Sequence, residues 1–135
     1  MIVVDANVVA YLLIEGRKTE LARELREADS QWRLPPLWRA EFLNVLAMQV
    51  QHGGFDPSVA EQVWQSAIKL LGGGETQINE VSALRLAIKN RLTAYDAQYV
   101  TLAQHLGVRC VSEDRELRRK FPRLVVSMAD AVLAK

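Results

Sequence analysis

Residues 2–9 read IVVDANVV, and this stretch decides how the rest of the sequence is interpreted. Its β-branched Ile and Val residues predict a short, fully buried strand over residues 2–5, followed by a helix that reaches Leu13. Asp5 lies at the end of that strand, where an unpaired buried carboxylate is costly. Capping the following helix is one role that suits an Asp at this position. A chemical role at the end of a strand is the other.

Short apolar segments alternate with helical patterns along the rest of the chain. Strands are expected at residues 2–5, 31–36, 76–79, 108–112 and 124–126. Further helices are expected at residues 19–28, 37–51, 56–71, 80–91, 93–107, 113–120 and 127–135. This alternation predicts an α/β fold, in which a short parallel sheet is flanked by helices as a three-layer sandwich. The length of 135 residues suits a single domain over residues 1–135.

Composition restricts the possible partners only weakly. The chain has 17 Lys and Arg against 16 Asp and Glu residues, so net charge gives no strong indication of a polyanion partner. No apolar run reaches the roughly 18 residues of a membrane span, and no charged segment precedes the first strand. We therefore expect a cytoplasmic protein that does not enter the membrane.

Four carboxylates lie where the pattern predicts burial or the end of a strand: Asp5, Glu41, Asp96 and Asp114. Glu41 interrupts an apolar stripe of the helix at 37–51, with Asn44 close by on the same helix. Asp96 shares a stripe with apolar residues but also fits a capping box with Thr93. Asp114 follows the strand at 108–112, where it is also an ordinary first-turn acid of the next helix.

These carboxylates are harder to explain together than singly. Ligands of α/β folds bind beyond the carboxyl ends of the strands, where Asp5 and Asp114 are both expected. Four carboxylates on one edge repel each other unless a cation lies between them. Ligands that are all oxygen favour Mg²⁺ or Mn²⁺ over zinc, which prefers His or Cys.

Three segments of the chain resemble the PIN domain, especially the VapC-like toxins of prokaryotic toxin–antitoxin pairs. They are IVVDANVV (2–9), LWRAEFLNVL (37–46) and TAYDAQYVTLAQHLGVRCVSEDREL (93–117). The resemblance covers nearly the whole chain and implies a metal-dependent ribonuclease with a PIN-like fold. The residues that match the acidic motif positions of the family are Asp5, Glu41, Asp96 and Asp114. Asn7 matches a small polar position, and Ser112 replaces the usual Thr while keeping a hydroxyl.

The resemblance implies that these four carboxylates bind Mg²⁺ or Mn²⁺ and catalyse RNA cleavage, with Asn7, Asn44 and Ser112 in support. It also implies a homodimer and a cognate antitoxin. Basic residues after the last carboxylate are expected to contact RNA phosphates, although such a run is also typical of a solvated helix face: Arg115, Arg118, Arg119 and Lys120.

Three other functions compete with a ribonuclease as interpretations of this sequence. A PIN-like RNA-binding or scaffold module without catalysis is the main alternative. A haloacid-dehalogenase-like phosphatase is disfavoured because Asn7 stands where its second Asp is needed. A dinucleotide-binding domain is disfavoured because no G-x-G-x-x-G follows the first strand.

Overall fold

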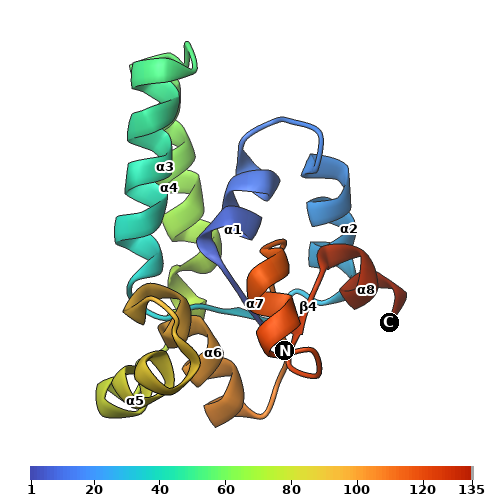
Figure 1. Ribbon diagram of the computed structural model, residues 1–135. Coiled ribbons are helices and arrows are strands. Elements are labelled where there is room, and N and C mark those ends of the chain that lie inside the picture. Colours follow the sequence, from blue (N-terminus) through green and yellow to red (C-terminus); the bar gives the residue numbers. More distant parts are fainter. Residues whose placement is uncertain (135) are drawn as a thin grey trace.

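The computed structural model describes residues 1–134, which fold around a four-stranded parallel sheet (Figure 1). Its strands are β1 (Ile2–Val4), β2 (Trp32–Arg33), β3 (Cys110–Val111) and β4 (Val125–Val126), in the order β2-β1-β3-β4. Every pairing is parallel, with Ile2 opposite Trp32 and Val3 opposite Cys110. The two sequence-distant strands β1 and β3 therefore lie in the middle of the sheet, and their carboxyl ends share one edge.

Helices connect these strands, as the alternating pattern predicted. They are α1 (Ala6–Leu13), α2 (Thr19–Ala28), α3 (Trp38–His52), α4 (Pro57–Leu71), α5 (Glu80–Asn90), α6 (Ala94–Leu106), α7 (Arg115–Lys120) and α8 (Met128–Leu133). Six of them begin after a side chain that accepts a backbone N–H, which satisfies a donor left free at the helix start. The capping residues are Asp5, Asp56, Asn79, Thr93, Asp114 and Ser127. Within residues 1–134 no helix is long and apolar enough to cross a membrane.

Strand β1 separates two hydrophobic clusters because successive side chains of a strand point to opposite faces. Ile2 and Val4 pack with residues of α1, α2, α3, α4 and α8. Val3 packs on the other face with residues of α6 and α7. The sheet thus lies between two helical layers, and the predicted three-layer α/β sandwich is confirmed (Figure 1).

The prediction of a strand at residues 76–79 is wrong. A single parallel bridge joins Leu34 to Glu75 instead, with backbone hydrogen bonds of 3.2 Å to the Gly74 oxygen and 2.8 Å from the Thr76 nitrogen. The following segment is non-repetitive and ends at Asn79, which caps α5. A Cβ at position 74 would lie 2.1 Å from the Trp32 oxygen, so glycine is what lets the two backbones approach this closely. Lys135, the last residue of the helix expected at 127–135, lies outside the described residues.

Candidate active site

Asp5 lies at the junction of β1 and α1, where its side chain can both cap α1 and take part in a site at the end of the strand. Its carboxylate Oδ1 accepts the Val8 N–H at 3.0 Å and so caps α1. Its own backbone N–H donates to the Val111 oxygen at 3.4 Å, which ties it to the end of β3. Burial raises the pKa of Asp5 from 3.8 to about 6, although hydrogen bonds from Ser112 and Val8 act to lower it. The strand therefore holds a carboxylate in surroundings that disfavour its negative charge.

Glu41 comes from the first turn of α3 and is held by a residue that the sequence did not single out. Tyr99 of α6 donates its hydroxyl hydrogen to Glu41 Oε1 at 2.6 Å, and its side chain is buried. Burial raises the pKa of the Glu41 carboxyl, the Tyr99 hydrogen bond lowers it, and the Asp96 charge raises it further. Tyr99 lies three residues after Asp96 and so shares a helix face with it, which is the one signal that could have found it.

The apolar stripe predicted for this helix is shifted. The expected stripe runs through Leu37, Glu41, Val45 and Met48. The buried residues of α3 are instead Trp38, Phe42 and Leu46, each one position further along the helix than the first three of these. Glu41 therefore lies beside the buried stripe and is only half-buried. It does not interrupt the core, and this position leaves its carboxylate accessible from the edge of the sheet.

Asp96 combines its two proposed roles. Its backbone N–H donates to the Thr93 hydroxyl at 3.1 Å, so the expected cap at the start of α6 is present. Its side chain is half-buried and faces the other carboxylates. Burial raises the pKa of the Asp96 carboxyl and the Asp114 charge raises it further, while the Lys120 charge lowers it.

One cavity of about 220 Å³ collects most of the predicted site. It is lined by Asp5, Ala6, Asn7, Glu41, Asn44, Val45, Asp96 and Tyr99. These residues come from the end of β1, the start of α1, and helices α3 and α6. Three carboxylates and two amides predicted from the sequence are thus brought together at the carboxyl edge of the sheet.

Asp114 and Ser112 do not line this cavity. Ser112 is fully buried after β3, and its hydroxyl accepts the Asp114 N–H at 3.1 Å. Asp114 is exposed, and its Oδ1 accepts the Glu116 and Leu117 N–H groups at 2.9 and 3.1 Å, which caps α7. Its charge still acts on Asp96, so Asp114 stands at the border of the acidic group. Both backbone N–H groups that it accepts among residues 1–134 bind the same oxygen, Oδ1.

The donor set suits a hard divalent cation, because it consists of carboxylate and amide oxygens. Burial is the main cause that raises the pKa values of Asp5, Glu41 and Asp96, and the negative charges of neighbouring carboxylates raise them further. Within residues 1–134, no three His, Cys, Asp or Glu side chains stand close enough to hold a metal ion without adjustment. The donor atoms therefore suit a hard cation by their chemistry, although the carboxylates among residues 1–134 do not converge closely enough here to ligate one.

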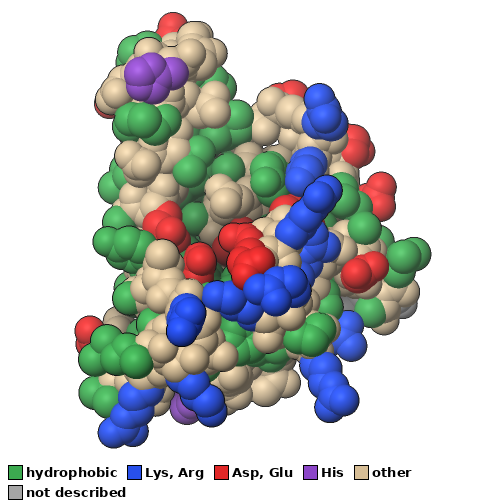
Figure 2. All heavy atoms as spheres, viewed as in Figure 1, with side chains coloured by type: hydrophobic (Ala, Val, Ile, Leu, Met, Phe, Trp, Pro, Cys, Tyr) green, Lys and Arg blue, Asp and Glu red, His purple; other side chains and the backbone are tan. Residues whose placement is uncertain are grey.

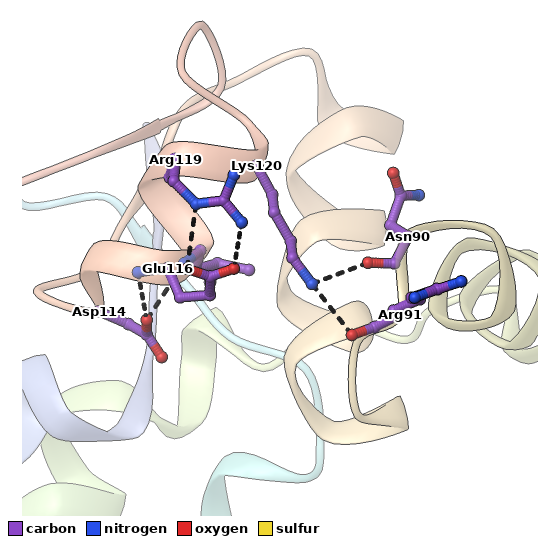
Figure 3. A network of polar contacts seen from close by, with 7 residues as sticks. Asn90, Arg91, Asp114, Glu116, Arg119 and Lys120 are labelled. Atoms are coloured by element: carbon purple, nitrogen blue, oxygen red, sulfur yellow. Dashed lines mark hydrogen bonds and ion pairs between the residues drawn. The ribbon is translucent and has the colours of Figure 1, made fainter.

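The predicted RNA-binding residues are less uniform than their sequence suggests. Figure 2 shows Lys and Arg side chains beside and below an acidic patch in the middle of one face. Arg115 is exposed, whereas Arg119 is paired with Glu116. Lys120 Nζ donates to the backbone oxygens of Asn90 and Arg91, at 2.9 and 3.0 Å (Figure 3).

Arg118 is half-buried, and its Nε atom has no hydrogen-bond partner among the described residues 1–134. Helix α7 thus carries one cation bonded to the end of α5, one paired with Glu116, and two, Arg115 and Arg118, that make no ion pair with residues 1–134.

Comparisons with protein families, curated proteins and solved structures each find similar proteins. The PIN domain family model matches residues 2–121. Ribonuclease VapC3 of Pyrobaculum aerophilum is 31% identical over 130 residues, which are 92% of this chain and 97% of that protein. The crystal structure of PAE2754 from Pyrobaculum aerophilum has a TM-score of 0.75 at 20% identity, covering 98% of this chain and 94% of that one. FitAcB from Neisseria gonorrhoeae gives a TM-score of 0.70 at 15% identity, covering 96% and 99%.

Proposed function

The chain belongs to the PIN domain family, and on that basis we propose that it is a divalent-metal-dependent endoribonuclease and the toxin of a toxin–antitoxin pair. The observation that carries the proposal is the cavity lined by Asp5, Glu41 and Asp96. These residues come from separate elements, and each has a pKa raised by burial. Perturbed carboxylates that converge in one cavity are typical of functional sites.

The direct cation ligands in this proposal are Asp5 and Asp96, with Glu41 as a third. Bound Mg²⁺ or Mn²⁺ would polarise a phosphodiester and lower the pKa of an attacking water. Tyr99 fixes the Glu41 carboxylate through its hydrogen bond and so positions it. The amides of Asn7 and Asn44 line the same cavity and can donate to phosphate or ribose oxygens. Asp114 adds its negative charge to the site from the border of the carboxylate group.

The test is cleavage of single-stranded RNA by the purified protein with Mg²⁺ or Mn²⁺ and with EDTA. Metal stabilisation of the reacting phosphate is worth several kcal/mol, so EDTA or Asp5→Asn should lower the rate at least about 100-fold. Asp130→Asn is the matched control, because Asp130 is exposed on α8 outside the cavity. Undiminished cleavage in EDTA contradicts the metal mechanism. RNA binding without cleavage under either metal favours the alternative of a non-catalytic RNA-binding module.

The toxin role has a separate test in cells. Expression of the wild-type protein alone should arrest growth, and Asp5→Asn should relieve the arrest at an equal protein level. Co-expression of the protein encoded by a neighbouring small gene should relieve it as well, if that gene encodes the antitoxin. Equal toxicity of wild type and variant would show that RNA cleavage is not the cause.

A homodimer is the assembly that we propose. Its support is an apolar stripe on α5, where Val81, Leu84 and Ile88 are 56%, 56% and 72% exposed. Exposed apolar patches of this kind mark interaction surfaces. Trp64, by contrast, stacks on Trp38 and is mainly part of the core. Light scattering should give twice the monomer mass for wild type and the monomer mass for Ile88→Glu. A monomeric wild-type protein contradicts the proposal.

A further inference from the structure

A second, larger cavity adjoins the acidic one. It has a volume of about 510 Å³ and lies between α1, the connection to α2, and α3. Asn7 and Val45 line both cavities, so the two lie next to each other with these side chains between them. A polymer with one phosphate at the acidic cavity can therefore extend past Asn7 directly into this space. Its volume lies within the range of small-molecule sites, which run from about 300 to 1,000 Å³.

The lining of this second cavity combines an aromatic ring, amides and cations. Tyr11 supplies a half-buried ring, and the Lys18 Nζ atom lies 5.0 Å from the centroid of that ring. Arg17 is exposed beside it, and the amides of Asn7 and Gln49 complete the polar lining. The cavity itself contains no Asp or Glu among its described lining residues, in contrast to its neighbour.

The two cations are held differently. Lys18 Nζ lies 3.4 Å from Glu113 Oε1, so this ammonium already has a counter-charge and a fixed position over the ring. Arg17 makes no ion pair or hydrogen bond with residues 1–134 and is the cation most available to an incoming anion. A ring, two amides and an available cation match the base, its polar edge and the phosphate of one nucleotide.

We propose that this second cavity is a nucleotide subsite, which holds the RNA residue next to the cleaved phosphodiester. The inference rests on the proposed ribonuclease function and identifies where the RNA substrate binds beside the acidic cavity. The part of the Tyr11 ring that stays exposed contacts the base, and Arg17 contacts the adjoining phosphate, while Lys18 stays paired with Glu113. The negative charge of the acidic cavity repels RNA. A neighbouring site with cations and an aromatic ring can hold the RNA chain close to the carboxylates. A protein segment is disfavoured as the occupant because the cations and the position beside the acidic cavity suit a phosphodiester chain.

The experiment measures binding of a fluorescein-labelled single-stranded RNA by anisotropy in EDTA, where the proposed nuclease is inactive. Tyr11→Leu should weaken binding about tenfold, since base–aromatic stacking is lost, and Tyr11→Phe should bind within about twofold of wild type. Arg17→Ala should make the salt dependence shallower, with a slope reduced by about 0.7 for one lost phosphate contact. Arg85→Ala, an exposed arginine on α5, is the control and should leave both affinity and slope unchanged.

The outcomes separate this inference from the proposed function. Tyr11 packs against the core, so Arg17→Ala provides a test that does not depend on folding of the Tyr11 variants. Unchanged affinity in Tyr11→Leu and Arg17→Ala, with wild type cleaving RNA, overturns the subsite alone and leaves the cavity to a protein partner. Binding that depends on Tyr11 and Arg17 without any cleavage supports the subsite and overturns the ribonuclease. A wild-type protein that neither binds nor cleaves RNA overturns both.

Discussion

Replacing Asp5 with Asn should abolish RNA cleavage and yet make the metal-free protein more stable at neutral pH. Burial raises the pKa of the Asp5 carboxyl from 3.8 to about 6. Each pKa unit corresponds to about 1.4 kcal/mol of differential interaction, so keeping this carboxylate ionised in the native state costs about 3 kcal/mol. Removing the charge at pH 7.5 recovers at most that amount.

The substitution keeps the local geometry that Asp5 provides. The side-chain oxygen of Asn can accept the Val8 N–H, as Asp5 does at 3.0 Å, and Asn caps helices as well as Asp. The Ser112 hydroxyl, which hydrogen-bonds to the Asp5 side chain, can also accept a hydrogen from an amide there. We therefore expect the free energy of unfolding to rise by about 1–3 kcal/mol at pH 7.5 in EDTA.

The effect should depend on pH with a defined sign. Between pH 3.8 and about 6 the native protein retains a proton on Asp5 that the unfolded chain has released. The contribution of Asp5 to the free energy of unfolding therefore falls as the pH rises through this window. Because wild type carries the full penalty only above the window, the advantage of Asp5→Asn should shrink toward zero when the pH is lowered from 7.5 to 4.

Urea unfolding followed by tryptophan fluorescence measures this difference, since Trp32 and Trp38 are buried. The exposed control Asp130→Asn should change the free energy of unfolding by less than about 0.5 kcal/mol. Magnesium should then raise the midpoint of wild type more than that of Asp5→Asn, because a ligand of the native state stabilises it by mass action. The reasoning is refuted if Asp5→Asn is less stable than wild type at pH 7.5, or if its gain is equal at pH 4.

Tyr99→Phe removes the hydrogen bond to Glu41, so the free energy of unfolding should fall by about 1.5–3 kcal/mol. The same change should raise the Glu41 pKa, so the pH at which cleavage is lost on acidification should move upward. Asp96→Asn should be inactive and, in EDTA, more stable by on the order of 1 kcal/mol; a lower melting midpoint would show that its charge serves the cap of α6. Lys120→Ala should lower stability by about 1–3 kcal/mol in urea unfolding, since its ammonium donates to two backbone oxygens. Arg119→Ala should leave the stability close to that of wild type, because its ion pair with Glu116 is exposed to solvent. Equal effects of the Lys120 and Arg119 substitutions would contradict this division of roles.

The parts of the site that could be predicted are those that local pattern determines. Asp5 was recognisable because it follows an apolar strand, and the parallel topology then required its side chain to lie at the carboxyl edge of the sheet. Asp96 was recognisable because it shares a helix face with Val100, which is buried. In each case a charged residue conflicts with its apolar surroundings within a few positions of the sequence.

The parts that could not be predicted depend on contacts between distant segments. The Tyr99 hydroxyl meets Glu41 across 58 positions, and nothing in the pattern of either helix specifies that pairing. Lys120 lies in a basic run that predicts RNA contacts, but its ammonium donates hydrogen bonds to the backbone oxygens of Asn90 and Arg91 at the end of α5. The sheet pairing near residue 75 was missed because it is one bridge long and depends on the close approach of Gly74. The RNA-binding role of the basic residues stays a prediction.

The pairing of β1 with β3 sets the moment at which a newly made copy of this protein can act. Val3 lies opposite Cys110, and the backbone N–H of Asp5 donates to Val111. A ribosome adds about 5–20 residues per second, so roughly 5–20 s separate the synthesis of the two strands. During that interval Asp5 has no β3 to hold it, and α6, which carries Asp96, is itself still being made. The edge of the sheet that holds Asp5 beside Asp96 therefore assembles only after both α6 and β3 have been made.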